Sequence, residues 1–341
     1  MSTLVTGNLG YIGTVLTEIL VSRGYEVIGL DIGYFKDCEL VKTNKNIKQI
    51  LKDIRDIEIT DLDGVDSLIH LSALSNDPLG EFDPKLTYEI NYSSTIKLAK
   101  LAEKKGIKRF IYVSSQSMYG ISRTNEELDE YSSNKNPLTE YAKTKWKAEL
   151  ELNKLNSKNF NVVSFRPSTV FGASPRLRCD IVFNNLVASA YTMGKIDIKS
   201  DGTPWRPVVH IRDVCSALIS GLEAPLNLIS GRAFNVGLKN GNYTVRQMAE
   251  VVKKVLPKVN LFFSNEHSDS RTYKVSFKRI FNELKDYYKP IWTLEKGALE
   301  LLKFFKMINF TKEDFLGIKT NRLKSLKSNF TKKFTHDLRL K

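Results

Sequence analysis

The stretch Thr6-Gly7-Asn8-Leu9-Gly10-Tyr11-Ile12-Gly13 decides the fold of this chain of 341 residues. An apolar run at 4–6 predicts a strand before it, and residues 11–23 predict a helix after it. Glycines at this junction permit a tight turn and a close backbone approach, so the free N–H groups of the helix can hold a pyrophosphate. A tight turn without a ligand would use glycines too. We predict a cofactor site formed by Gly7, Gly10, Tyr11, Ile12 and Gly13.

The next predicted strand, residues 26–31, ends in an acidic side chain. Asp31 lies about 20 residues beyond the glycine turn, where a carboxylate binds the ribose 2′-OH of a dinucleotide. A carboxylate would repel a 2′-phosphate at this position, so Asp31 favours NAD over NADP.

Strand-like and helix-like segments alternate through the first half of the chain. Further strands are predicted at 47–54, 67–72, 109–115 and 161–167, and the clearest helices at 86–105 and 138–154. Apolar strands separated by amphipathic helices indicate βαβ units, and hence an α/β fold with a doubly wound parallel sheet, the Rossmann fold.

The regular alternation ends near residue 167, and the helices predicted after it cover 180–193, 213–222 and 244–255. We predict an NAD-binding domain over 1–167 and a smaller mixed α/β substrate-binding lobe, mainly over 168–310, with some segments returning to the first domain. Residues 311–341 form a basic C-terminal extension.

The net charge of +14 is concentrated at the end of the chain. Residues 303–341 contain eleven Lys or Arg against three Asp or Glu. We interpret this tail as a solvated terminal segment, with docking to an acidic partner or a membrane surface as the alternative. No nucleic-acid-binding module accompanies the charge, so we expect no nucleic-acid partner.

Other features indicate a cytoplasmic protein without membrane insertion. No run approaches the roughly 20 apolar residues that span a bilayer, and the first residues lack the basic segment of a signal peptide. Cys38, Cys179 and Cys215 form neither a CxxC motif nor a Cys/His cluster, which argues against a disulfide framework and a metal site.

Tyr141 and Lys145 lie four residues apart at the start of a predicted helix. This spacing places both side chains on one helical face, so the phenol and the ammonium group can converge on one reacting centre. A neighbouring cation stabilises a phenolate, which lets Tyr141 act as a general base or acid near neutral pH. An ordinary surface helix with an exposed lysine is the alternative. The segment VSSQSMYG at 113–120 ends a predicted strand, where such a sheet binds its ligands.

These motifs together resemble the extended short-chain dehydrogenase/reductase family, in its NAD-dependent sugar-nucleotide epimerase/dehydratase group. The resemblance rests on TGxxGxxG at 6–13, SSxxxYG at 114–120 and YxxxK at 141–145, in the order of the family. It implies that Ser115 is the catalytic hydroxyl beside Tyr141 and Lys145, with Ser114 and Ser117 as near alternatives. It also implies a homodimer through the helices at 86–105 and 138–154.

Further segments match the cofactor contacts of that family. Residues 53–54 match a strand-end pair that contacts adenine, 70–75 (HLSALS) match a segment that lines the cofactor, and Asn91 matches a helix asparagine. A strand-end cap for Asp53 and a packed core histidine at position 70 are the alternatives, and we assign His70 no catalytic role. The implied cofactor residues are Asp53, Ile54, Leu71, Ala73, Asn91, Ser114, Tyr141, Lys145 and Pro167.

The second lobe contains candidate substrate contacts. In relatives that bind nucleoside-diphosphate sugars, the regions that match Asn185, Arg206 and Arg271 meet the nucleotide. The planar fork of Arg206 suits bidentate pairing with phosphate oxygens, although each arginine could equally form a surface salt bridge. The predicted substrate residues are Ser115, Ser117, Asn185, Arg206 and Arg271.

The predicted reaction begins with hydride transfer from a sugar carbon, C4, to NAD. Dehydratases of the family place Asp-Glu after the catalytic Ser/Thr, whereas this chain has Gln116 and Ser117 there, which disfavours elimination of water. We expect an NAD-dependent nucleoside-diphosphate-sugar epimerase that oxidises C4 transiently. A 4-ketoreductase or 4-dehydrogenase with exchangeable cofactor is the alternative, and a non-catalytic NAD-binding sensor or scaffold is a minor one.

Overall fold

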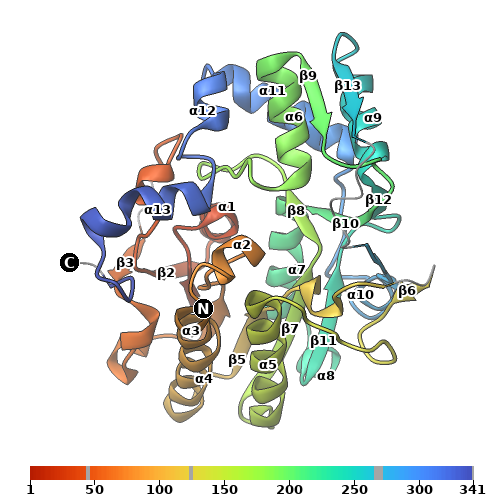
Figure 1. Cartoon of the computed structure of the whole chain (residues 1–341). Helices are drawn as coiled ribbons and strands as arrows, with labels where there is room; N and C mark the ends of the chain where they lie inside the picture. The colour runs from red at the N-terminus through yellow and green to blue at the C-terminus, as the bar shows by residue number, and fades with distance from the viewer. Residues whose placement is uncertain (44–46, 123–125, 265–271, 340–341) are drawn as a thin grey trace.

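The computed structural model describes residues 1–43, 47–122, 126–264 and 272–339. Its main sheet has seven parallel strands in the order β11-β7-β5-β4-β1-β2-β3 (Figure 1). The strands are β1 (Ser2–Thr6), β2 (Glu26–Asp31), β3 (Lys48–Leu51), β4 (Ser67–His70), β5 (Arg109–Val113), β7 (Asn161–Pro167) and β11 (Arg232–Val236). The order reverses between β1 and β4, where a doubly wound sheet opens a crevice at its carboxyl ends. The predicted fold class is therefore confirmed.

Side chains of alternate residues in the central strands enter two separate cores. Val5 and Ile69 face α1 (Tyr11–Ser22) and α7 (Ile211–Glu223), while Leu4 and Leu68 face α4 (Ser94–Lys105) and α5 (Glu140–Leu155). Both faces are covered, which is why these strands read as apolar runs and not as an apolar–polar alternation.

The helix predicted at 86–105 is interrupted. It comprises α3 (Pro84–Tyr88), a π-helical turn η4 (Glu89–Ser93) and α4. Within the wide turn, the amide of Asn91 accepts from the Leu74 backbone N–H at 2.8 Å and donates to the Leu74 carbonyl at 3.2 Å. The π turn thereby fixes the chain that follows β4, and π turns often occur at functional sites.

The second lobe shares its core with the first. It contains a three-stranded sheet and a two-stranded parallel pair, with β8 (Thr169–Phe171), β10 (Trp205–His210), β12 (Asn242–Thr244), β9 (Lys195–Ile198) and β13 (Asn260–Phe263). Helices α6 (Val182–Met193), α9 (Val245–Val255) and α11 (Leu294–Met307) pack on these strands. Phe165 of the main sheet and Phe183 of α6 belong to one apolar cluster. Strand β11, which the sequence did not predict, returns from this part of the chain to pair with β7.

The basic tail is folded, so its interpretation as a solvated terminal segment is wrong. Helix α12 (Lys312–Leu316) packs against α6, and α13 (Arg322–Lys333) turns back to the edge of the main sheet near β2 and β3 (Figure 1). Leu326 and Leu338 are 1% and 0% exposed within the same apolar cluster as Leu4. Apolar residues spaced along the tail provide a buried face, and this overrides the charge of their neighbours.

Candidate active site

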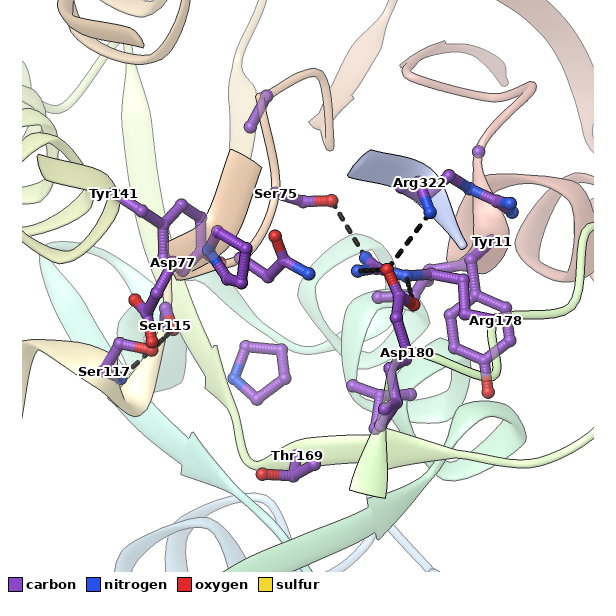
Figure 2. Close-up of a pocket in the computed structure, with 18 of the residues that line it drawn as sticks. Tyr11, Ser75, Asp77, Ser115, Ser117, Tyr141, Thr169, Arg178, Asp180 and Arg322 are labelled. Carbon is purple, nitrogen blue, oxygen red and sulfur yellow. Dashed lines mark hydrogen bonds and ion pairs between the residues drawn. The ribbon is translucent and has the colours of Figure 1, made fainter. Parts of the chain in front are cut away.

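A cavity of about 1030 Å³ lies at the carboxyl ends of the central strands, between the two lobes. Figure 2 shows that Ser115, Ser117 and Tyr141 border one part of it, and Tyr11, Arg178, Asp180 and Arg322 another. This is the crevice in which open α/β sheets bind ligands.

The glycine turn has no room for side chains. The Gly7 N–H donates to the Leu30 carbonyl at 2.8 Å, and Gly7 has φ +72°, which favours glycine. A Cβ on Gly13 would lie 2.1 Å from the Gly7 carbonyl oxygen. No side chain caps α1 at Gly10, so the first N–H groups of this helix face the cavity and fit the pyrophosphate of a dinucleotide.

Asp31 lines the cavity at the end of β2. Its carboxylate accepts the Gly33 N–H at 2.7 Å and the Leu9 N–H at 3.2 Å, so it also braces the glycine turn. Burial raises the pKa of Asp31, while these two backbone donors lower it. Two carboxylate oxygens have acceptor capacity beyond these two bonds, which fits a ribose diol.

Asp53 and Ile54, which the sequence predicts to contact adenine, line one end of the cavity. Asp53 caps the turn η2 (Ile54–Asp56) through the Arg55 N–H at 2.9 Å and forms an ion pair with the Arg55 side chain at 2.6 Å. The aromatic residues Tyr34 and Phe35, which no motif indicated, line the same end.

The segment after β4 supplies Leu71 and Ala73 to the cavity wall. Asn91 is not among the residues that line the cavity, because its amide is bonded to Leu74 behind that wall. His70 bridges Thr6 at 2.6 Å and Thr95 at 2.8 Å, and burial lowers its pKa to about 3. The ring is therefore neutral and structural.

The expected chemical residues come together in the cavity. Ser114 and Ser115 follow β5, while Tyr141 and Lys145 come from the first turns of α5. Ser115 hydrogen-bonds to the Tyr141 phenol and donates to the Ser117 hydroxyl at 3.0 Å. The Ser114 hydroxyl is buried and has no partner among the described residues, so it is open to a bound ligand.

Burial shapes the acid–base chemistry of this pair. It raises the pKa of Tyr141, which the Ser115 hydrogen bond and Arg178 lower and Asp77 raises further. Burial lowers the pKa of Lys145 to about 7, and its ammonium donates to the Val113 carbonyl at 2.8 Å. The groups that lower the pKa of Tyr141 against this burial are therefore Ser115 and Arg178, whereas the sequence indicated Lys145 as the stabilising cation.

Three of the predicted substrate residues, Ser117, Asn185 and Arg206, line the cavity, as does Pro167. The Asn185 amide donates to the Cys179 carbonyl at 2.9 Å, and Arg206 donates to the Trp205 carbonyl at 2.9 Å. Arg271 lies outside the described residues.

Sequence reasoning missed several charged residues on the cavity wall, among them Asp77, Arg178, Asp180 and Arg322. Arg178 and Asp180 come shortly after the segment RPSTVFG at 166–172, which contains the predicted cofactor residue Pro167, and a search just beyond Pro167 could have found them. Arg322 carries no motif and lies among many surface cations of the tail.

The described residues contain no group of three or more His, Cys, Asp or Glu side chains that could hold a metal ion. Within the same part of the chain, no helix is long and apolar enough to cross a membrane.

Fold and cavity define a dinucleotide-dependent enzyme of the Rossmann class. A family model described as the NAD dependent epimerase/dehydratase family matches residues 3–237, more than half of the chain, and the chain belongs to this family. The resemblance to this group, the assignment as an enzyme and the NAD cofactor are thereby confirmed.

Individual relatives differ in reaction. The chain is 28% identical to the UDP-glucose 4-epimerase of Bacillus subtilis (strain 168), over 75% of this chain and 82% of that protein. It is 26% identical to UDP-glucuronic acid decarboxylase 1 of Arabidopsis thaliana, over 89% of this chain and 69% of that protein. Among solved structures, the NAD-dependent NDP-hexosamine 5,6-dehydratase TunA superposes with a TM-score of 0.78 at 21% identity, over 90% of this chain and 98% of that chain. This likeness shows the shared fold.

Proposed function

We propose that this enzyme is a nucleoside-diphosphate-sugar epimerase that oxidises C4 of the sugar transiently. The observation that carries the proposal is the convergence of Ser115, Tyr141 and Lys145 on one cavity that also holds the glycine turn and Asp31. The likeness to a UDP-glucose 4-epimerase supports the same reaction.

Each residue has a defined role in this proposal. Ser115 binds the C4 hydroxyl, Tyr141 accepts its proton, and Lys145 binds the nicotinamide ribose. NAD, when bound, supplies a hydride acceptor beside C4. After the keto sugar has presented its other face, C4 would take back the hydride from the cofactor and the proton from Tyr141, so the reaction is redox-neutral overall and needs no further acid or base.

Elimination of water is disfavoured by the residues that follow Ser115. Gln116 is 1% exposed and its amide donates to the Arg166 carbonyl at 2.9 Å, while Ser117 has no acidic proton to give. Neither side chain can transfer a proton as a carboxyl group does.

The test begins with the cofactor content of the purified protein, measured by absorbance and mass spectrometry after denaturation. UDP-, GDP-, dTDP- and CDP-sugars, including UDP-glucuronic acid, are then supplied without added cofactor. We expect stoichiometric NAD and the appearance of C4 isomers.

The Tyr141→Phe variant serves as the matched control. It should retain NAD and lose about 10²–10⁴-fold in turnover, because it lacks the proton acceptor. A protein without bound NAD that turns over only with added NAD or NADH would overturn the epimerase proposal and indicate a reductase or dehydrogenase.

A further inference from the structure

Arg322 is a buried cation on the cavity wall. It is 2% exposed, and its guanidinium donates to the carbonyls of Lys319 at 2.9 Å and Arg176 at 2.5 Å. Across the described residues, no carboxylate lies within ion-pair distance of this guanidinium. An ionised group buried without an opposite charge is costly, so the site favours an anionic ligand.

The nearest acidic partner is already occupied. Asp180 is bound by Arg178 at 2.8 and 3.0 Å, and from Arg322 it accepts the backbone N–H at 3.2 Å (Figure 2). Burial and the neighbouring Arg178 lower the pKa of Arg322 to about 10, so it remains charged at neutral pH. Arg178 and Arg322 both line the cavity, and the Asp180 carboxylate pairs only with the Arg178 guanidinium, which leaves the Arg322 charge on this wall without an ion-pair partner among the described residues.

The pair lies toward the dinucleotide end of the cavity. In Figure 2, Arg322 lies close to Tyr11 of the glycine turn and on the other side of the cavity from Ser115 and Tyr141, while the Arg178 guanidinium reaches from the same side as Arg322 to Ser75. The Arg322 guanidinium lies 5.3 Å from the ring of Phe35, which follows the strand that carries Asp31. The anion expected here is therefore the pyrophosphate that the glycine turn receives.

The C-terminal segment, residues 311–339, holds Arg322 in this place. The ring of Phe334 packs edge-on against Tyr34 at 5.2 Å, and the Tyr34 hydroxyl donates to the Leu338 carbonyl at 2.7 Å. The Cys179 N–H donates to the Thr320 carbonyl at 2.8 Å. The segment thus connects the loop after β2 with the second lobe, on both sides of Arg322.

We propose that the C-terminal segment is a wall of the NAD site and that Arg322, together with Arg178, binds the cofactor pyrophosphate. The proposal deepens the assignment of NAD as cofactor and does not depend on C4 epimerisation. Release of NAD then requires the loss of these charge-assisted contacts, so the enzyme retains its cofactor between turnovers.

The test compares Arg322→Gln with Lys327→Gln, an exposed cation of the same helix. Bound NAD is counted per chain, and its release is timed by exchange with isotope-labelled NAD followed by mass spectrometry. Charge-assisted hydrogen bonds predict about 10- to 100-fold faster release from Arg322→Gln. Lys327→Gln should match the unmodified protein, and UDP affinity should be unchanged in both.

Two results would overturn the proposal. One is unchanged NAD release from folded Arg322→Gln, and the other is a loss of UDP affinity with NAD release unaltered, which would assign the anion site to the sugar nucleotide. If Arg322→Gln does not fold, the same exchange measurement on Arg322→Lys tests the proposal. This variant keeps the charge but loses the bidentate fork, so it should release NAD faster than the unmodified protein. A protein that holds NAD but epimerises no sugar would contradict the proposed function alone.

Discussion

The Thr139 hydroxyl donates a hydrogen bond to Oδ1 of Asp77 at 2.7 Å. Thr139 also caps α5 by accepting the Ala142 N–H at 3.2 Å, and Asp77 begins α2 (Asp77–Gly80). A Cβ on Gly80 would lie 2.7 Å from Cβ of Tyr141, so α2 is in close contact with the first turn of α5. This contact places the Asp77 carboxylate on the cavity wall, where its charge acts on Tyr141.

Asp77→Asn should move the pH dependence of catalysis. The negative charge of Asp77 raises the pKa of Tyr141, so its removal lowers that pKa. Because the phenolate is the proton acceptor, the rising limb of kcat/KM against pH should shift to lower pH. The exposed Asp63→Asn provides the control, and an unshifted limb in Asp77→Asn would contradict this coupling.

Lys145→Met should stabilise the NAD-free protein while it removes activity. The pKa of Lys145 falls from 10.5 to about 7 on folding, so between these values the unfolded chain binds a proton that the folded chain does not. The contribution of Lys145 to the free energy of unfolding therefore rises with pH through this window and is least favourable below pH 7. In the variant, Tm at pH 7 should rise by a few degrees and this pH dependence should disappear.

Lys143→Met, an exposed lysine of the same helix, is the comparison for these melts. A lower Tm in Lys145→Met at pH 7 would contradict the prediction. It would show that the hydrogen bond from Lys145 to the Val113 carbonyl stabilises the fold by more than burial of the charge destabilises it.

Gly13→Ala should impair NAD binding through the backbone. The new Cβ would lie 2.1 Å from the Gly7 carbonyl oxygen, so the turn must move away from α1. Such overpacking costs about 1–3 kcal/mol, and we expect lower NAD content and a lower Tm. Gly24→Asn places a side chain at an open left-handed position and should leave NAD content unchanged. Full NAD occupancy in Gly13→Ala would refute the role of the turn.

Glu149→Gln should destabilise the packing of α5 on β7. Glu149 and Arg166 form a buried ion pair at 2.5 Å with side chains 7% and 3% exposed. Loss of one partner of such a pair costs about 3–5 kcal/mol, because the other charge stays buried. Urea unfolding followed by circular dichroism measures this change, and Glu223→Gln, in a pair on the surface, should change stability by less than about 0.5 kcal/mol.

Local patterns predicted the parts of the site that depend on neighbours in sequence. The glycine turn, Asp31 and the Tyr141–Lys145 spacing are each defined within one βα unit, so their placement in the cavity followed from strand and helix periodicity. The predicted contact of Asn91 with the cofactor is not found at the cavity wall, because its side chain lies in a π turn and bonds to Leu74. Such a turn has no clear signal in the sequence. Strand β11 was missed because its pairing with β7 joins segments far apart in the chain.

The sequence by itself determined the doubly wound sheet, NAD as the cofactor and the family, because periodicity and short motifs carry this information locally. Tertiary structure alone decided which charges meet in the cavity. Asp77 reaches Tyr141 only through the packing of α2 on α5, and Arg322 reaches the cavity only because the basic tail has a buried apolar face. Contacts between distant segments depend on complementary packing, and no single segment encodes them.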